Sequence, residues 1–299
     1  MTVSSITLTD ADRGLSSLVK PRPGVAFQGL ATAATVRAVT ESRQQRHGMK
    51  DTTSSFDDAA VSLNLQLYPD PASPGTRALL DEFGAFLHPR ARPLLVVTDT
   101  EWDEARQLML RFDAGNSPIA LGEGLTRTIQ YQWRAPNGIW EAATPVSVAL
   151  PAIIEGDTAG LIWTSSGLVW TNTGAVWTAG SSPSASLVAS EGNVEADWQA
   201  QMFGPAVGPK LGNDTAGLTL EFTDDLVLSA TDYVLLDSAS QSAVLNGAGG
   251  SSVLGNLNFP TSEWWLMQPG LNQVRYYPTA GGSSSTQAQI TFRPAWACT

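Results

Sequence analysis

The chain has 299 residues, of which 42% are hydrophobic and 15% are charged. A chain of this length buries roughly three-quarters of its unfolded surface, which suits one large domain or two medium ones. The charged fraction lies below the roughly 25% of ordinary soluble domains. Ser, Thr, Gly and Ala fill the difference, which favours a β-rich protein with many turns and excludes a helical bundle or a disordered chain.

The formal net charge is −11, and it is distributed unevenly. Residues 1–134 hold 14 basic and 15 acidic side chains, whereas residues 135–299 hold 3 and 13. The acidic second half argues against binding to nucleic acid or to anionic lipid. No apolar run approaches the roughly 18 residues of a membrane span, and the first ten residues lack the pattern of a secretory signal. We therefore expect a protein made in a cytoplasm, without membrane contact.

The first half reads mainly as strands. Residues 1–10 alternate in part and predict a strand, whereas the polar and basic residues 35–51 predict a long excursion between strands. The cleanest alternation covers residues 61–67, with Val and Leu on one face and Ser, Asn and Gln on the other. Ser73 as the cap and Pro74 at the first turn predict one helix, which ends before His88.

Further strands are expected after this helix. Residues 93–97, 107–112 and 128–133 have strand patterns, and residues 135–138 read as a hairpin turn that leads to a strand at 139–140. The composition and the charge balance change near residues 143–146. We therefore predict two domains, 1–145 and 146–299.

The second domain is predicted to contain only strands and loops. Its expected strands are 218–222, 233–236, 264–267, 273–277 and 288–292. Short strands at this spacing favour a β-sandwich or a jelly roll.

A seven-residue repeat lies near the start of this second domain. The pattern Gly-x-x-Trp-Thr recurs three times and places tryptophans at Trp163, Trp170 and Trp177. A coiled coil is excluded, because every unit contains Gly and β-branched residues. Flat apolar rings suit the C–H faces of sugars, so these tryptophans are a candidate glycan-binding face. Packing in a core or between subunits is the alternative, and the residues alone favour it.

Residues that carry catalysis or hold metals are sparse. The two histidines, His47 and His88, have no Gly-x-Ser-x-Gly elbow to serve, and adjacent carboxylates such as Asp57 and Asp58 point to opposite faces of a strand. Cys298 is the only cysteine, and the acidic residues match no calcium-loop motif. We expect no enzymatic activity, no cofactor and no metal.

The basic residues are concentrated between Arg13 and Lys50, with one aromatic among them. This pattern does not form a nucleic-acid platform, because stacking residues are missing. A contact surface for an acidic protein partner and a solvated loop are equally compatible with it.

The end of the chain is the most distinctive part. Residues 264–272 read W-x-L-x-x-P-G-x-N, and residues 290–296 read I-x-F-R-P-A-W. These patterns resemble the end of phage tail proteins of the distal tail family, and the "minor tail proteins" of actinobacterial phages look especially similar. The order of strands and helix in the first half is similar to that family as well, so the resemblance covers most of the chain. The repeat at 160–177 is not part of the family pattern.

The resemblance implies a structural role in the virion, at the distal end of the tail, after assembly in the host cytoplasm. It implies a hexameric ring that joins the tail tube protein to the hub or tail-associated protein, with tape measure and receptor-binding proteins as further neighbours. The N-terminal domain would be a β-sandwich or split barrel with one helix, and residues 35–51 would be its belt arm. The C-terminal domain would be a galectin-like or carbohydrate-module-like sandwich.

The charge pattern is compatible with this implied ring. A basic arm beside a nearly neutral domain pairs well with acidic patches on a neighbouring copy. The candidate interface residues are therefore Arg37, Arg43, Arg46, His47 and Lys50. A carbohydrate-binding module that recognises host glycans is the alternative function, and a hydrolase is a distant third.

Overall fold

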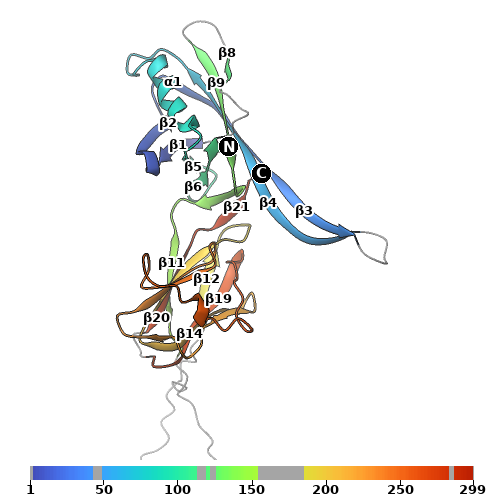
Figure 1. Cartoon of the computed structure of the whole chain (residues 1–299). Helices are drawn as coiled ribbons and strands as arrows, with labels where there is room; N and C mark the ends of the chain where they lie inside the picture. The colour runs from blue at the N-terminus through green and yellow to red at the C-terminus, as the bar shows by residue number, and fades with distance from the viewer. Residues whose placement is uncertain are drawn as a thin grey trace, which may run out of the picture. The chain divides into compact units, whose positions relative to one another are not determined.

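The structure is a computed structural model that describes residues 3–42, 49–112, 119–121, 126–153, 185–282 and 286–298. The chain divides into two compact units (Figure 1). Unit 1 comprises Met1–Thr144 together with Ala295–Thr299, and unit 2 comprises Pro145–Pro294. The chain therefore leaves unit 1 after Thr144 and returns to it at Ala295, a return that nothing in the sequence indicates.

Unit 1 contains two antiparallel sheets. Sheet A has the order β2-β1-β5-β6-β10-β21. Its strands are β1 (Val3–Asp10), β2 (Leu15–Lys20), β5 (Leu94–Asp99), β6 (Arg106–Met109), β10 (Ile139–Ala142) and β21 (Ala295–Ala297). A short 3₁₀ turn, η1 (Ala11–Arg13), joins β1 to β2. The strand expected over residues 1–10 is confirmed by β1.

Sheet B has the order β3-β4-β9-β7, with β8 paired to β9. Its strands are β3 (Val25–Ser42), β4 (Met49–Leu67), β7 (Arg111–Phe112), β8 (Ile119–Leu121) and β9 (Arg127–Ala135). The alternation predicted at 61–67 and 128–133 is confirmed, since the apolar residues of β4 and β9 are buried and the polar residues between them are not. Both sheets contribute to one core, which includes Leu63, Leu65, Tyr131 and Trp133.

The helix α1 (Thr76–Gly84) closes on this core through Leu79 and Phe83, and a 3₁₀ turn η2 (Ala85–Leu87) continues it. The predicted cap is wrong by two residues. Gly75 occupies the N-cap position with φ 95°, and Ser73 Oγ instead accepts a hydrogen bond from the Gly75 amide at 3.3 Å. A positive φ favours glycine, so the backbone rather than a side-chain cap starts this helix.

Two other predictions for unit 1 are wrong because neighbouring residues enter different sheets. The strand expected at 107–112 is divided at Leu110, whose amide bonds to the Pro93 carbonyl, so that β6 lies in sheet A and β7 in sheet B. The turn at 135–138 likewise connects β9 of sheet B to β10 of sheet A and is not a hairpin. Sequence patterns report which face is buried, and they do not report which sheet a strand joins.

Unit 2 consists of two five-stranded antiparallel sheets. Sheet C has the order β11-β20-β13-β17-β18, and sheet D the order β12-β19-β14-β15 with β16 paired to β14. The strands of sheet C are β11 (Val146–Pro151), β13 (Trp198–Phe203), β17 (Tyr233–Asp237), β18 (Ser242–Leu245) and β20 (Gln287–Phe292). Those of sheet D are β12 (Ser186–Ser190), β14 (Ala206–Asn213), β15 (Leu218–Glu221), β16 (Val227–Leu228) and β19 (Gly270–Ala280). A 3₁₀ turn, η3 (Leu254–Asn256), lies between β18 and β19.

The fold class is thus confirmed as mainly β, with several antiparallel sheets and one α-helix in the described residues. The strand expected at 264–267 is wrong, because only Met267 pairs there, in an isolated bridge to Ala196. This segment instead packs as irregular chain, with Trp265 stacked on Trp198 at 4.4 Å between ring centres.

Candidate assembly surface

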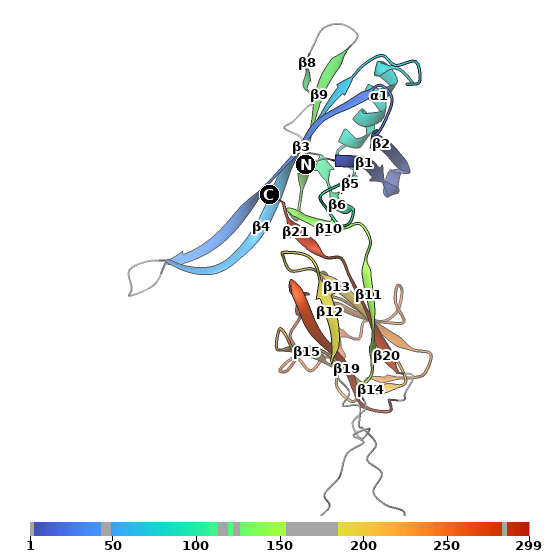
Figure 2. The same cartoon turned by 180° about the vertical axis from the view of Figure 1, so that it is seen from behind.

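The segment expected as an unpaired excursion is a β-ribbon. Beyond Ala59, where β9 ends its pairing, β3 and β4 continue together to the pair Ser42 and Met49. We call this two-stranded extension, residues 34–58, the ribbon; it leaves the rest of unit 1 as a long hairpin (Figures 1 and 2). The prediction of an unpaired excursion is therefore wrong, because backbone pairing does not need an apolar stripe.

The structure brings the predicted interface residues to the ribbon only in part. Arg37 lies in β3 opposite Ser55, and Lys50 lies in β4 opposite Glu41. The other three predicted residues, Arg43, Arg46 and His47, lie outside the described residues.

Strand β3 forms an open edge of sheet B. In the described residues it pairs with β4 alone along its 18 residues, at the end of the sheet order. Natural edge strands carry lysine, proline or bulges that oppose pairing with a further chain. The β3 sequence contains neither proline nor lysine and is rich in Ala and Thr, although bulges interrupt its register with β4. Its free backbone groups are therefore available to another strand.

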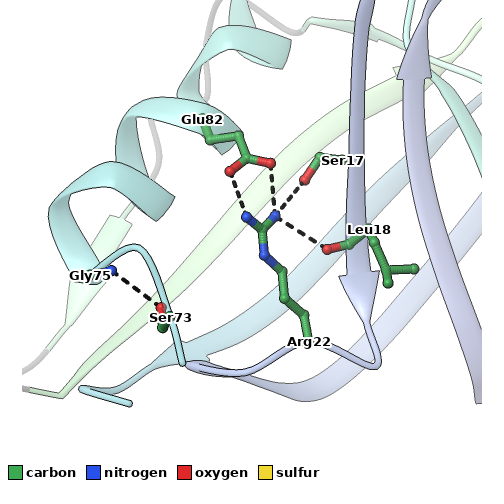
Figure 3. Close-up of polar contacts among 6 residues, drawn as sticks. All are labelled: Ser17, Leu18, Arg22, Ser73, Gly75 and Glu82. Atoms are coloured by element: carbon green, nitrogen blue, oxygen red, sulfur yellow. Dashed lines mark hydrogen bonds and ion pairs between the residues drawn. The ribbon is translucent and has the colours of Figure 1, made fainter. Parts of the chain in front are cut away.

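Arg22 fixes the place where β3 begins. Its guanidinium makes two 2.7 Å contacts to the Glu82 carboxylate on α1, and it donates to Ser17 Oγ at 3.1 Å and to the Leu18 carbonyl at 3.3 Å (Figure 3). The hydrogen bonds from Arg22 lower the pKa of Glu82, and the same pairing raises the pKa of Arg22. One side chain thus ties α1 to the end of β2 and to the turn that enters β3.

A stack of three tryptophans and one arginine holds the C-terminal strand in unit 1. The Arg106 guanidinium lies 3.8 Å from the Trp296 ring centre and 4.4 Å from that of Trp102. Trp102 in turn meets Trp140 edge-on, with ring centres 5.8 Å apart. Burial lowers the pKa of Arg106, opposed by the nearby Glu104 and Asp103 carboxylates. The terminal motif P-A-W therefore supplies the ring that completes this stack.

A cavity of about 270 Å³ lies on the other side of the two rings Trp102 and Trp140. Residues 30–32 of β3 line it, together with Val3 of β1 and Val97 of β5. Its lining is apolar except for the Thr32 hydroxyl, and no lining residue is charged. The cavity therefore suits an apolar group and offers no chemistry for catalysis.

The other terminal motif is structural in unit 2. Asn272, the last residue of W-x-L-x-x-P-G-x-N, is fully buried and donates to the Gln268 carbonyl at 2.8 Å, which closes the turn at Pro269 and Gly270. Its Oδ1 accepts a hydrogen bond from Asn213 Nδ2 at 3.1 Å, which joins this turn to the end of β14. The motif holds two turns together and forms no binding site.

One aromatic side chain in the described residues is exposed. Phe259 has 64% of its surface exposed, in a loop between η3 and β19. The loop is pinned on β15, because the Asn258 amide donates to the Glu221 carbonyl at 2.8 Å and Thr261 Oγ1 donates to the Glu221 carboxylate at 2.7 Å. The predicted glycan residues Trp163, Trp170 and Trp177 lie outside the described residues.

The described residues contain no group of three or more His, Cys, Asp or Glu arranged to hold a metal ion. His88 has a local structural contact, since its Nδ1 accepts the Arg90 amide at 3.1 Å. Asp58 pairs with Arg134 across β4 and β9. No helix in the part of the chain that the structure describes is long and apolar enough to cross a membrane.

Comparison with known proteins identifies the kind of molecule. Residues 191–296 match the family profile described as "siphovirus-type tail component, C-terminal domain". The Dit protein of phage SPP1, described as a paradigm of the hub adsorption apparatus in phages that infect Gram-positive bacteria, superposes with a TM-score of 0.61. This alignment covers 97% of this chain and 98% of SPP1 Dit at 11% identity.

A chain of the phage P2 baseplate in its activated conformation with Ca also matches, with a TM-score of 0.47, 11% identity and 98% coverage of both chains. No curated protein matches in a sequence search. The resemblance drawn from the terminal motifs is confirmed: this chain is a Dit-like phage tail component, and its residues 191–296 belong to the C-terminal domain family of siphovirus-type tail components.

Proposed function

We propose that six copies of this chain close into a ring at the distal end of a phage tail, where the ring joins the tail tube to the hub. Unit 1 forms the ring, the ribbon embraces a neighbouring copy, and unit 2 projects from it. The observation that carries this proposal is the open, unprotected edge of β3, which continues into the ribbon. A head-to-tail ring leaves no such edge free, because each copy covers its neighbour.

The role is structural and non-catalytic. The tail tube protein and the hub or tail-associated protein are the proposed partners, with tape measure and receptor-binding proteins nearby. The acidic excess of residues 135–299 supports a projecting unit 2, because like-charged units repel one another when they are held close together.

Light scattering over a range of concentrations tests the ring. Six chains of 31.6 kDa give a mass of about 190 kDa. Exchange of Arg37 and Lys50 for Glu reverses two charges on the ribbon and is expected to lower this mass while the monomer stays folded. Arg77→Glu is the matched control, because this arginine is 86% exposed on α1 outside the ribbon. An unchanged oligomer in the ribbon variant would contradict the role of the ribbon charges.

Binding of a host glycan by unit 2 is the second candidate function, and the pinned, exposed ring of Phe259 favours it. Fragments of cell-wall polysaccharide titrated calorimetrically into the protein test this idea. Heat that is lost in Phe259→Ala supports a sugar contact there. A panel of host glycans that gives no heat with the wild type removes this candidate.

A further inference from the structure

The cavity beside Trp102 and Trp140 lies next to the open edge of sheet B. Leu30, Ala31 and Thr32 are consecutive residues of β3, and all three line the cavity. Strand β3 runs past β1 at this point, before it enters the ribbon (Figures 1 and 2). A further strand paired to β3 lies about 4.8 Å away from it. Such a strand therefore passes close to the cavity and directs every second side chain toward it.

The wall of the cavity is formed in advance. Trp102 is held between the Trp140 ring on one side and the Arg106 guanidinium on the other, and Trp296 holds Arg106 in turn. A group that enters this cavity does not have to order the rings first, which saves part of the entropic cost of binding. Interface anchors are typically aromatic residues and arginine in such fixed arrangements.

We propose that this cavity is a socket for one apolar side chain of the strand that a second copy of this chain adds to β3. The inference rests on the proposed ring and specifies its main contact. A second copy is the occupant because a head-to-tail ring places one surface of each chain on a different surface of the next. The uncharged lining and the volume of about 270 Å³ admit a side chain of the size of leucine, methionine or phenylalanine.

Three variants of the full chain test the socket against the edge. Trp102→Ala removes the wall, Leu30→Trp fills the space, and Ala33→Lys adds a charge to the exposed edge of β3 outside the socket. Phe259→Ala is the matched control, since it removes an exposed aromatic ring from unit 2. Light scattering gives the concentration at which the oligomer dissociates, and circular dichroism with thermal unfolding verifies that each variant is folded.

We expect Trp102→Ala and Leu30→Trp each to raise the dissociation concentration at least about tenfold, as loss of an interface anchor does. Trp102→Phe, which keeps a ring, recovers most of this loss and shows that a folding defect is not the cause. If Ala33→Lys dissociates the oligomer while both socket variants leave it unchanged, the socket is wrong and the ring through β3 stands. A wild type that stays at 31.6 kDa at every concentration contradicts both proposals.

Discussion

Arg22 joins three parts of unit 1 through one side chain: the end of β2, the turn into β3 and the helix α1 (Figure 3). Arg22→Ala is expected to destabilise unit 1 by about 1.5–3 kcal/mol, the usual range for a hydrogen bond between charged groups that are partly buried. Urea unfolding at pH 7 measures this loss. Arg77→Ala is the control, because the Arg77–Asp81 pair is mostly exposed and should change the stability by less than about 0.5 kcal/mol.

The same pair makes the stability depend on pH. Arg22 lowers the pKa of Glu82 in the folded state. The contribution is therefore fully present above the unfolded pKa of a glutamate, about 4.3, and is lost as the pH falls through the lower folded value. The gap in unfolding free energy between wild type and Arg22→Ala should shrink from pH 5 to pH 2. A gap that stays constant over this range would show that the carboxylate charge contributes nothing.

Cys298 reports on the attachment of β21. Its thiol is buried in the core of unit 1, and this burial raises its pKa to about 11. We expect no reaction with a thiol reagent at pH 8 in the time that the unfolded protein reacts fully, because the thiolate is the reacting form. Trp296→Ala removes the outer ring of the arginine stack and should accelerate the labelling at least tenfold. Equal labelling rates in the two proteins would mean that Trp296 does not hold the strand.

At the scale of elements, the sequence predicted the strands that have one buried face and missed those that have none. The alternation at 61–67 and 128–133 is confirmed in β4 and β9, where the apolar face meets the core. The ribbon was missed because its pairing depends on backbone hydrogen bonds, which leave no hydrophobic period. The interface residues were placed from charge alone, and the open edge of β3 has no sequence signal, because sheet order is a property of the assembled fold.

The ribbon should be separable from the stability of unit 1. The core takes its β4 side chains from Ala59 through Leu67, beyond the part of β4 that extends into the ribbon. Replacement of residues 36–56 by Asn-Gly leaves Thr35 and Asp57 joined by a two-residue hairpin turn. We expect the unfolding free energy to change by less than about 1 kcal/mol and the oligomer to dissociate. Loss of cooperative unfolding would show instead that the ribbon is part of the folding unit.

At the scale of the whole molecule, unit 2 is an insertion between two neighbouring strands of sheet A. Strand β10 ends just before Pro145, and β21, which pairs with it, begins just after Pro294. Unit 2 has its own two sheets, and β11 and β20 close its ends by pairing with each other. Residues 145–294 expressed alone should therefore fold and unfold cooperatively, as calorimetry can measure. A product without tertiary structure would show that unit 2 depends on unit 1.

This insertion also sets the order of events during translation. The ribosome makes β10, then the roughly 150 residues of unit 2, and only afterwards β21. At about 5–20 residues per second, β10 waits about 8–30 s for its partner strand. During that time the edge of sheet A, the Arg106 side chain and the Trp140 ring have no Trp296 to cover them. A nascent chain therefore cannot complete unit 1 before unit 2 has been synthesised, so an interrupted chain lacks the arginine stack that borders the cavity beside β3.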